Sequence, residues 1–310
     1  MFESIRDDAT SGATSLVVRA SRELGEAAAS LDQSDAGAFW DALVAACGEL
    51  LRAGREMAPI VNLVGSVLSA AERAVLSGRQ AETAALAVEL ECRRVWETAT
   101  DRLADIGEHA GALIEPGSTV ATTSDGDSVR AVVDAAARSH KSFDMIVSES
   151  RPNLEGLAMA RFAGELGIAV TLVSDAALPG LASRCDLVLL GADSVSEESL
   201  VAKTGAYPLA LAAREAAVPC CVVACTDKLL PAALRGDPGR PRDPEELLES
   251  APRNVSPLNA YFEDVPLSLI RTLVTEEGAC EPEDVPTMLR KRPVSPALLQ
   301  LLYPAAGVGN

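Results

Sequence analysis

Apolar residues recur every three or four positions through the first third of the chain, the spacing of an amphipathic helix. Asp35 stands just before one such segment and is a candidate N-cap. No β-like run interrupts the pattern, which predicts an antiparallel helical bundle over residues 1–112. The helical period covers 16–24, 39–51, 57–71 and 82–106.

From about residue 113, short apolar runs alternate with amphipathic segments. Buried strands that alternate with helices are typical of a parallel sheet with right-handed crossovers. The expected fold class is therefore α/β, with an N-terminal helical domain (1–112) and a C-terminal Rossmann-like doubly wound parallel sheet (113–310). The GxGxxG fingerprint is absent from the sequence, and 236–244, with three prolines, is expected to be a surface loop. Predicted strands lie at 119–122, 145–147, 169–173, 187–190 and 221–223, and predicted helices at 128–138, 155–165, 176–183 and 206–217.

The net charge of −18 on 310 residues argues against direct nucleic-acid binding, which requires a basic face. Of the 27 basic residues, only Lys141, Lys203, Lys228 and Lys291 are lysine. An acidic, lysine-poor, alanine-rich chain is typical of the cytoplasm of a halophilic archaeon, where carboxylates keep the surface hydrated. The alternative is a high-GC genome, which also favours arginine and alanine over lysine.

The numbers and spacing of the cysteines and histidines predict a protein of a reducing cytoplasm that holds no metal. The seven cysteines are odd in number and form no CxxC pair, and there are only two histidines, so no zinc site and no cofactor are expected. The first residues, MFESIRDDAT, are acidic and contain no apolar stretch of a signal peptide. No uninterrupted apolar run reaches 18 residues, so no membrane span is expected.

Ligands of an open α/β sheet bind beyond the carboxyl ends of its strands. After the first predicted strand, Gly126 precedes a helix N-terminus, where backbone N–H groups can hold a phosphate. Asp125 and Asp127 would repel a phosphate, and the turn is equally well explained as an N-cap cluster. After the second strand, Arg151 is restricted to extended geometry by the following proline and suits phosphate binding; the alternative is a surface arginine paired with Glu149.

The later strands bring further candidates. Asp175 is either an N-cap or a ligand to sugar hydroxyls, and Asp193 follows a strand with no helix directly after it. Lys203 and Gly205 come next, before an alanine-rich helix. Cys225, after the fifth strand, is either a small buried residue or an exposed thiol. Together these residues suit a phosphorylated, hydroxyl-rich small molecule or a nucleotide.

Seven motifs at these positions resemble, in order and spacing, the family of translation initiation factor 2B α/β/δ subunits. Its enzyme relatives are methylthioribose-1-phosphate isomerase and archaeal ribose-1,5-bisphosphate isomerase. The resemblance spans nearly the whole chain. It implies a helical N-terminal domain, a Rossmann-like C-terminal domain that forms a homodimer or higher oligomer, and an initiation factor 2-like partner. The motifs are SESRPNLEG (148–156), VTLVSDAA (170–177), GADSV (191–195), AKTGAYPLAL (202–211), VVACTDK (222–228), NAYFEDVP (259–266) and LVTEEGACEPEDVP (273–286).

In the isomerases, the resemblance implies a ring-opening aldose-to-ketose conversion in which a cysteine and the aspartate of the GAD motif shuttle protons. Asp193 matches that aspartate, whereas Ser124 stands in place of the cysteine. No cysteine lies between Cys92 and Cys185, so a shifted alignment does not restore the thiol. A thiol has a pKa of about 8.5, whereas a serine hydroxyl is a far weaker acid that needs an adjacent base. Losing a proton-transfer group typically removes roughly 10²–10⁴-fold in rate.

Residues at other positions that contact the ligand in the family also differ from the family pattern. Ala202 and Ala206 stand where the family has asparagine and threonine, and Ser11 stands where the isomerases tend to have arginine. The residues assigned to the site are Asp193 and Ser124 as catalytic candidates and Arg151, Lys203, Gly205, Asp175 and Gly126 as substrate- or phosphate-binding candidates.

Three functions fit these residues. The favoured hypothesis is a non-catalytic initiation-factor-like protein that binds a sugar phosphate or nucleotide and acts through protein partners. The second is an isomerase of a phosphorylated pentose, with Asp193 as the main acid/base. The third is a different sugar-phosphate enzyme that uses Cys225, which requires that thiol to face the ligand.

Overall fold

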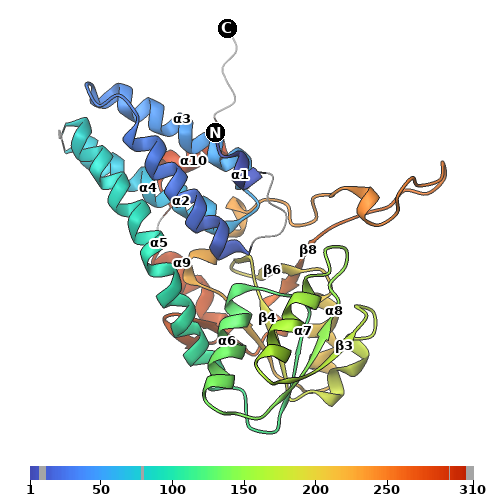
Figure 1. The fold of residues 1–310 in the computed structure, drawn as a ribbon. Helices are drawn as coiled ribbons and strands as arrows, with labels where there is room; N and C mark the ends of the chain where they lie inside the picture. The colour runs from blue at the N-terminus through green and yellow to red at the C-terminus, as the bar shows by residue number, and fades with distance from the viewer. Residues whose placement is uncertain (7–11, 78–79, 293, 305–310) are drawn as a thin grey trace. The chain divides into compact units, whose positions relative to one another are not determined.

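A computed structural model describes residues 1–6, 12–77, 80–292 and 294–304 (Figure 1). The chain divides by its internal contacts into two units. Unit 1 comprises Met1–Thr100, Ala233–Gly236 and Met288–Asn310, and unit 2 comprises Asp101–Ala232 and Asp237–Thr287. The long helix α5 (Ala81–Gly111) contributes residues to both. The assignment of domains to 1–112 and 113–310 stays a prediction.

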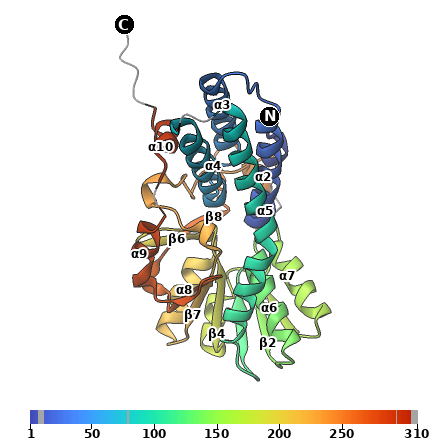
Figure 2. The ribbon, with the colours of Figure 1, turned by 90° about the vertical axis from the view of Figure 1, so that its left-hand side faces the viewer.

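Unit 1 is helical. Helices α2, α3 and α4 pack against one another, and α10 packs on α3 and α4 (Figures 1 and 2). Large apolar side chains such as Leu24, Phe39 and Leu68 are fully buried between them. The Asp35 carboxylate accepts a hydrogen bond from the Ala38 N–H at 2.8 Å, which confirms the predicted N-cap. The helices wholly within this unit are α1 (Glu3–Arg6), α2 (Ala13–Ala29), α3 (Ala36–Gly54), α4 (Ala58–Leu76) and α10 (Pro296–Leu302).

Helix α4 is long and apolar enough to meet the length and hydropathy criteria for a membrane span. It is the one such helix in the described part of the chain, and 56% of the relevant window is buried inside the structure. Ile60, Val61 and Val64 on this helix are among the fully buried residues. A core helix commonly meets the same two criteria, so the finding is weak evidence for a membrane.

The main element of unit 2 is a seven-stranded sheet of order β10-β9-β7-β4-β1-β2-β3. Every neighbouring pair is parallel except β10 and β9. Strands β1 and β4 lie at the point where the strand order reverses, which is where an open α/β sheet forms a crevice for ligands. The strands are β1 (Thr119–Thr122), β2 (Asp144–Ser148), β3 (Ala169–Val173), β4 (Leu187–Gly191), β7 (Cys220–Val223), β9 (Thr272–Thr275) and β10 (Gly278–Cys280).

The five predicted strands are therefore confirmed as the parallel core of a mixed α/β fold. One face of the sheet packs against α6, α7 and the end of α5 in a single apolar cluster, and α8 lies against β4 and β7. The segment 176–183, predicted as a helix, instead contains the 3₁₀ turn η1 (Pro179–Arg184). Pro179 and Gly180 both disfavour an α-helix interior. The helices wholly within unit 2 are α6 (Asp127–Arg138), α7 (Glu155–Glu165) and α8 (Ala206–Glu215), and α9 (Val285–Arg290) contributes residues to both units.

A second, antiparallel sheet was not predicted from the sequence. It has the order β5-β6-β8, with β5 at Ser194–Val195, β6 at Ser199–Lys203 and β8 at Phe262–Pro266. Its register places Lys203 opposite Phe262 and Ala202 opposite Glu263. The motif after Asp193 is thus joined to the distant segment 259–266. Strand β5 has only two residues, and β6 pairs with β8 about 60 positions later, so local periodicity did not indicate this sheet.

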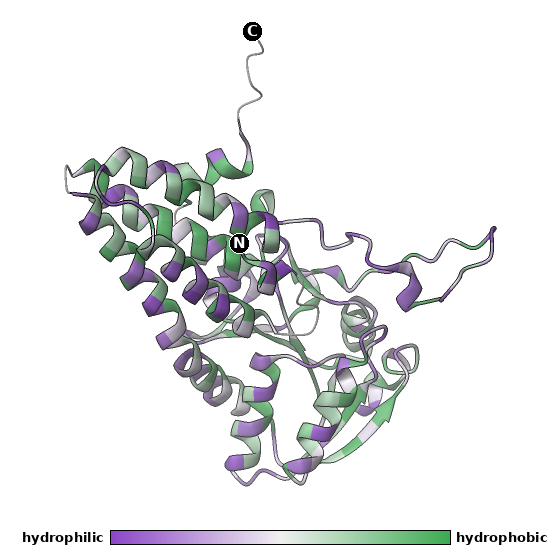
Figure 3. Cartoon of the chain, turned by 45° about the horizontal axis from the view of Figure 1, so that its top comes forward, coloured by the Kyte–Doolittle hydropathy of each residue, from purple (hydrophilic) through white to green (hydrophobic). Residues whose placement is uncertain are grey.

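The proline-rich segment extends away from the sheet of unit 2 and is orange in Figure 1. Residues 243–256 are exposed throughout and contain the 3₁₀ turn η4 (Pro244–Glu246), coloured hydrophilic in Figure 3. Hydrogen bonds from the Asn259 side-chain amide and the Tyr261 hydroxyl to Glu246 anchor this segment to unit 2. The surface loop predicted at 236–244 forms part of it.

Candidate functional site

Charged side chains gather where β1, β2, β4 and β7 end. Asp193 follows β4, and its neighbours Lys228, Glu155, Lys203 and Asp127 all act on it electrostatically. Burial is the largest effect and raises the pKa of the Asp193 carboxyl; Glu155 and Asp127 raise it further, and the two lysines oppose the rise. These five side chains, which we call the rim cluster, come from five separate segments of unit 2.

Lys203 is nearly buried, with 7% of its surface exposed. Its Nζ lies 2.6 Å from Oε2 of Glu155, 4.9 Å from the ring centre of Tyr261 and 5.8 Å from that of Phe262. The Glu155 carboxylate and the two aromatic rings stabilise the Lys203 ammonium, which offsets the free-energy cost of removing its charge from water. The lysine predicted to bind phosphate is held by the protein's own groups in the free chain.

Lys228, Asp127 and Glu155 were not assigned to the site from the sequence, and Glu155 makes the most contacts of the three. Its Oε2 accepts hydrogen bonds from Ser124 Oγ at 3.1 Å and Ser150 Oγ at 3.4 Å, and its Oε1 accepts one from Asn153 Nδ2 at 3.4 Å. Glu155 is the first residue of α7, so the helix start fixes its backbone. Its position in the SESRPNLEG motif was the available signal.

Asp175 is not an N-cap, which corrects that alternative, and its role as a ligand to sugar hydroxyls stays a prediction. Its two carboxylate oxygens accept the backbone N–H groups of Ser150 and Arg151, each at 2.7 Å. The carboxylate holds the loop after β2, in which Ser150 adopts a left-handed φ of 62°. Arg151 is exposed and its backbone makes this contact, so the structure does not bring its guanidinium into the rim cluster.

The turn after β1 also differs from expectation. Gly126 is the N-cap of α6 without a side-chain cap, and Asp125 instead binds Arg130 through two contacts of 2.6 Å. The N-cap-cluster interpretation is therefore wrong. No atom lies within 4 Å of the position that a Cβ on Gly126 would take, so the backbone N–H groups at the start of α6 are accessible to a phosphate.

Gly205 is the N-cap of α8, and backbone N–H groups at this helix start already form hydrogen bonds within the protein. Gly205 has a φ of 103°, a left-handed conformation that glycine adopts without strain. The Glu263 carboxylate accepts the N–H groups of Gly205 at 2.7 Å and Tyr207 at 2.9 Å. Gly205 thus fixes the end of β6, and a phosphate at its N–H would have to replace Glu263.

Cys225 does not face a ligand. Its side chain is 2% exposed, belongs to the apolar core of the sheet, and has a pKa raised to about 12 by burial. The hypothesis of an enzyme that uses this thiol is therefore wrong. Lys228, three residues later, is nearly buried and belongs to the rim cluster.

Among the buried polar atoms near the strand ends, Asp127 Oδ2, Ser128 Oγ and Ser194 Oγ form no hydrogen bond within the described residues, and Lys203 Nζ has only its ion pair with Glu155. Buried polar groups of this kind usually have a partner, such as water or a ligand. Within the same residues, no group of three or more histidine, cysteine or acidic side chains is placed to hold a metal. Ser11 lies outside the described residues.

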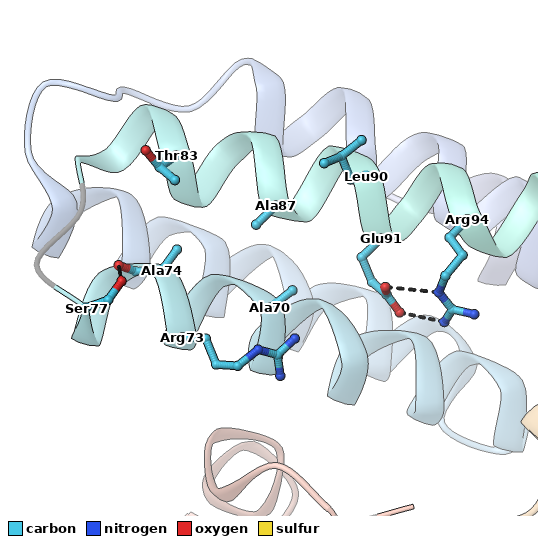
Figure 4. Close-up of a pocket in the computed structure, with 9 residues that line it drawn as sticks. All are labelled: Ala70, Arg73, Ala74, Ser77, Thr83, Ala87, Leu90, Glu91 and Arg94. Carbon is cyan, nitrogen blue, oxygen red and sulfur yellow. Dashed lines mark hydrogen bonds and ion pairs between the residues drawn. The ribbon is translucent and has the colours of Figure 1, made fainter.

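A separate groove of about 520 Å³ lies between α4 and α5 in unit 1. Its floor is Ala70, Ala74 and Ala87, and Arg94 pairs with Glu91 at its edge (Figure 4). Every residue that lines it belongs to unit 1. The groove therefore contains none of the rim cluster, and its chemistry is distinct from that of the strand ends.

The raised pKa of Asp193 predicts a stability effect that depends on pH. The folded protein binds the Asp193 proton more tightly than the unfolded chain, so the ionised carboxylate lowers stability as pH rises above the unfolded value of about 3.9 and through the raised pKa. Asp193→Asn should therefore raise Tm at pH 8, and the gain should shrink toward pH 4. Thermal melts across this range test it, with the exposed Asp144→Asn as the control. A lower Tm for Asp193→Asn at pH 8 would contradict the prediction.

The fold and the rim cluster define the class as a helical region joined to a doubly wound α/β unit with charged side chains at its strand ends. The chain belongs to the initiation factor 2 subunit family, whose model matches residues 9–282.

Relatives in this family carry two kinds of name. A ribose 1,5-bisphosphate isomerase of Haloferax volcanii is 30% identical over 289 residues, which are 90% of this chain and 87% of the relative. An eIF-2B subunit 2-like translation initiation factor of Pyrococcus horikoshii is 29% identical over 252 residues, 81% of this chain and 85% of the relative. The match to a ribose 1,5-bisphosphate isomerase of Archaeoglobus fulgidus, 34% identical, covers only 60% of each chain.

Solved structures share the fold. The Pyrococcus horikoshii translation initiation factor eIF-2B matches with a TM-score of 0.75 at 23% identity, covering 90% of this chain and 94% of that one. A chain of the tetrameric eIF2B-beta2-delta2 complex from C. thermophilum matches with a TM-score of 0.74 at 19% identity, covering 93% and 91%. At these identities the likeness concerns the fold alone.

Proposed function

We propose that this chain is a non-catalytic member of its family that binds a phosphorylated sugar at the strand ends of unit 2. The observation that carries the proposal is the rim cluster, in which two nearly buried lysines, Lys203 and Lys228, act on Asp193. Two cations suit a phosphate, and a nearby carboxyl suits a sugar hydroxyl. The unsatisfied Ser194 and Ser128 hydroxyls offer further hydrogen bonds for such a ligand.

Ser124 supports the non-catalytic form of the proposal. An aldose-to-ketose conversion needs one group that gives a proton and another that takes one, and Ser124 stands where the family has a thiol. A hydroxyl is too weak an acid to share this task readily. Within the described residues, Glu155 is the only carboxylate that accepts a hydrogen bond from the Ser124 hydroxyl, and it also pairs with Lys203.

The second candidate is an isomerase of a phosphorylated pentose. The raised pKa of Asp193 favours it, because a carboxyl that keeps its proton to higher pH is a better general acid near neutrality. The relative of Haloferax volcanii, aligned over 90% of this chain, is named for such an activity.

One experiment separates the two candidates. Incubation of the protein with ribose 1,5-bisphosphate in high salt should give saturable binding by calorimetry and no ribulose 1,5-bisphosphate above the blank. Turnover that disappears in Asp193→Asn would reject the non-catalytic proposal in favour of the isomerase. Restoring a thiol with Ser124→Cys is expected to raise any residual rate by roughly 10²-fold or more, since a thiol transfers protons far better than a hydroxyl.

The assembly and location belong to the same proposal. We propose a homodimer or higher oligomer formed through unit 2, supported by the edge strand β3, where Leu172 is 46% exposed. An initiation factor 2-like protein is the proposed partner, as the family description suggests. The net charge of −18 supports a location in a salt-rich cytoplasm and argues against direct RNA binding.

A further inference from the structure

Four donors in unit 2 converge on one internal carboxylate. Ser124 Oγ, Ser150 Oγ and Lys203 Nζ all contact Oε2 of Glu155, at 3.1, 3.4 and 2.6 Å, and Asn153 Nδ2 contacts Oε1 at 3.4 Å. Two hydroxyls, an amide and an ammonium around an oxyanion are also the donors that proteins present to phosphate groups.

Two of the donors, Lys203 and Ser150, are held in place by contacts that do not involve Glu155. The rings of Tyr261 and Phe262 flank the Lys203 ammonium, and β6 pairs with β8 at Lys203 and Phe262. Ser150 is 1% exposed, and Asp175 holds its backbone N–H at 2.7 Å. Its left-handed φ of 62° is a conformation that non-glycine residues seldom keep unless the surroundings impose it.

The Glu155 side chain, in contrast, is partly exposed to solvent. About a quarter of its side chain (26%) is exposed, against 6% for Lys203, so the carboxylate can turn toward solvent while the lysine stays buried. An ammonium left without a counter-ion at this depth attracts another anion strongly, because the surrounding dielectric is low.

We propose that Ser124, Ser150 and Lys203 form an oxyanion subsite that the Glu155 carboxylate fills in the free protein, and that a phosphate group of the ligand displaces it. The inference rests on the proposed function and adds to it the residue that sets phosphate affinity. Glu155 acts as an internal competitor, so only an anion that interacts with Lys203 more strongly than a single carboxylate binds tightly. A dianionic phosphate meets this requirement, and a neutral sugar does not.

Glu155→Gln tests the subsite, because it removes the charge and keeps the shape and the hydrogen-bonding oxygen. We expect this variant to bind inorganic phosphate and ribose 5-phosphate at least about tenfold more tightly than the unaltered protein, with no gain for ribose. Isothermal titration in a low-phosphate, high-salt buffer measures the affinities, and ³¹P NMR shows whether the phosphate itself is bound.

Two further variants make the result specific. Glu165→Gln removes the same charge from an exposed position at the other end of α7 and should leave the affinities unchanged. Glu155→Gln combined with Lys203→Gln removes both charges, so the gain should disappear. Melting curves show that each variant is folded.

The outcomes separate this inference from the proposed function. Equal or weaker phosphate binding by Glu155→Gln, with sugar-phosphate binding intact in the unaltered protein, overturns the subsite and leaves the proposed function in place. No phosphate binding by either protein rejects both. Binding by Glu155→Gln alone supports the subsite and rejects sugar-phosphate binding by the unaltered protein.

Discussion

Gly156→Ala is expected to destabilise the protein by about 3 kcal/mol, at the upper end for an added methyl group in a packed region. A Cβ at Gly156 would lie 1.7 Å from the carbonyl oxygen of Ser148 and 2.8 Å from its carbonyl carbon. Both atoms belong to the backbone of β2, so no flexible side chain can move aside.

The backbone of Ser148 is fixed from two sides. Ser148 pairs with Val173 on β3, and its hydroxyl donates to the Thr123 carbonyl at 2.9 Å. Helix α7 must therefore move away from β2, and this displaces Glu155 from Ser124 and Lys203. The variant is expected to lose both stability and the arrangement of the candidate site.

Gly164→Ala is the matched control, because it lies in the same helix with no atom within 4 Å of the added methyl group. It should stabilise the protein by roughly 0.5–1 kcal/mol, since alanine is the better helix former. Circular dichroism or calorimetry is the suitable measurement, because Trp40 and Trp96, the two tryptophans, both lie in unit 1. A melting point for Gly156→Ala equal to that of the unaltered protein would show that α7 can shift without cost.

Lys141→Met is expected to cost about 2 kcal/mol by uncapping the end of α5. The Lys141 ammonium donates to the carbonyls of Gly111 at 2.9 Å, Ala112 at 3.2 Å and Ile114 at 2.7 Å. The last carbonyls of a helix have no partner within the helix, and a cation there also interacts favourably with the helix dipole. Methionine keeps the length of the side chain and removes all three charged hydrogen bonds.

The exposed Lys291 provides the comparison for this prediction. Lys291→Met removes the same charge and should change stability by less than about 0.5 kcal/mol. Lys141→Arg should recover part of the loss, since it restores the charge with a different geometry. Equal melting points for Lys141→Met and Lys291→Met would mean that water replaces the three hydrogen bonds at no cost.

The parallel sheet was predictable because its strands are short apolar runs; β1, β2, β4 and β7 are buried along almost their whole length, whereas the edge strand β3 is mostly exposed. Residues 119–122, 169–173 and 187–190 were predicted as strands and form β1, β3 and most of β4. The antiparallel sheet was not predictable, since β5 has two residues and β6 finds its partner β8 about 60 positions later. Pairing over that separation depends on the folded chain rather than on local periodicity.

The candidate site was predictable only in part. Asp193 and Lys203 were found because they follow a strand end, and both belong to the rim cluster. Asp175 and Gly205 lie at equivalent positions, but Asp175 holds a loop and the Gly205 N–H is bound by Glu263. A position at the end of a strand indicates that the residue lies at that end of the sheet, but it does not determine which group its side chain contacts.

The sequence by itself determined the alternation of buried strands and helices along the second half of the chain, because this alternation depends on residue type and local periodicity. The match of Ser124 to a family cysteine stays a prediction from the resemblance. Only the tertiary structure decided that Glu155 joins Ser124 to Lys203 and that burial outweighs two lysines at Asp193. Coulomb energies and desolvation depend on distances between groups far apart in the chain, and such distances exist only once the strands are assembled.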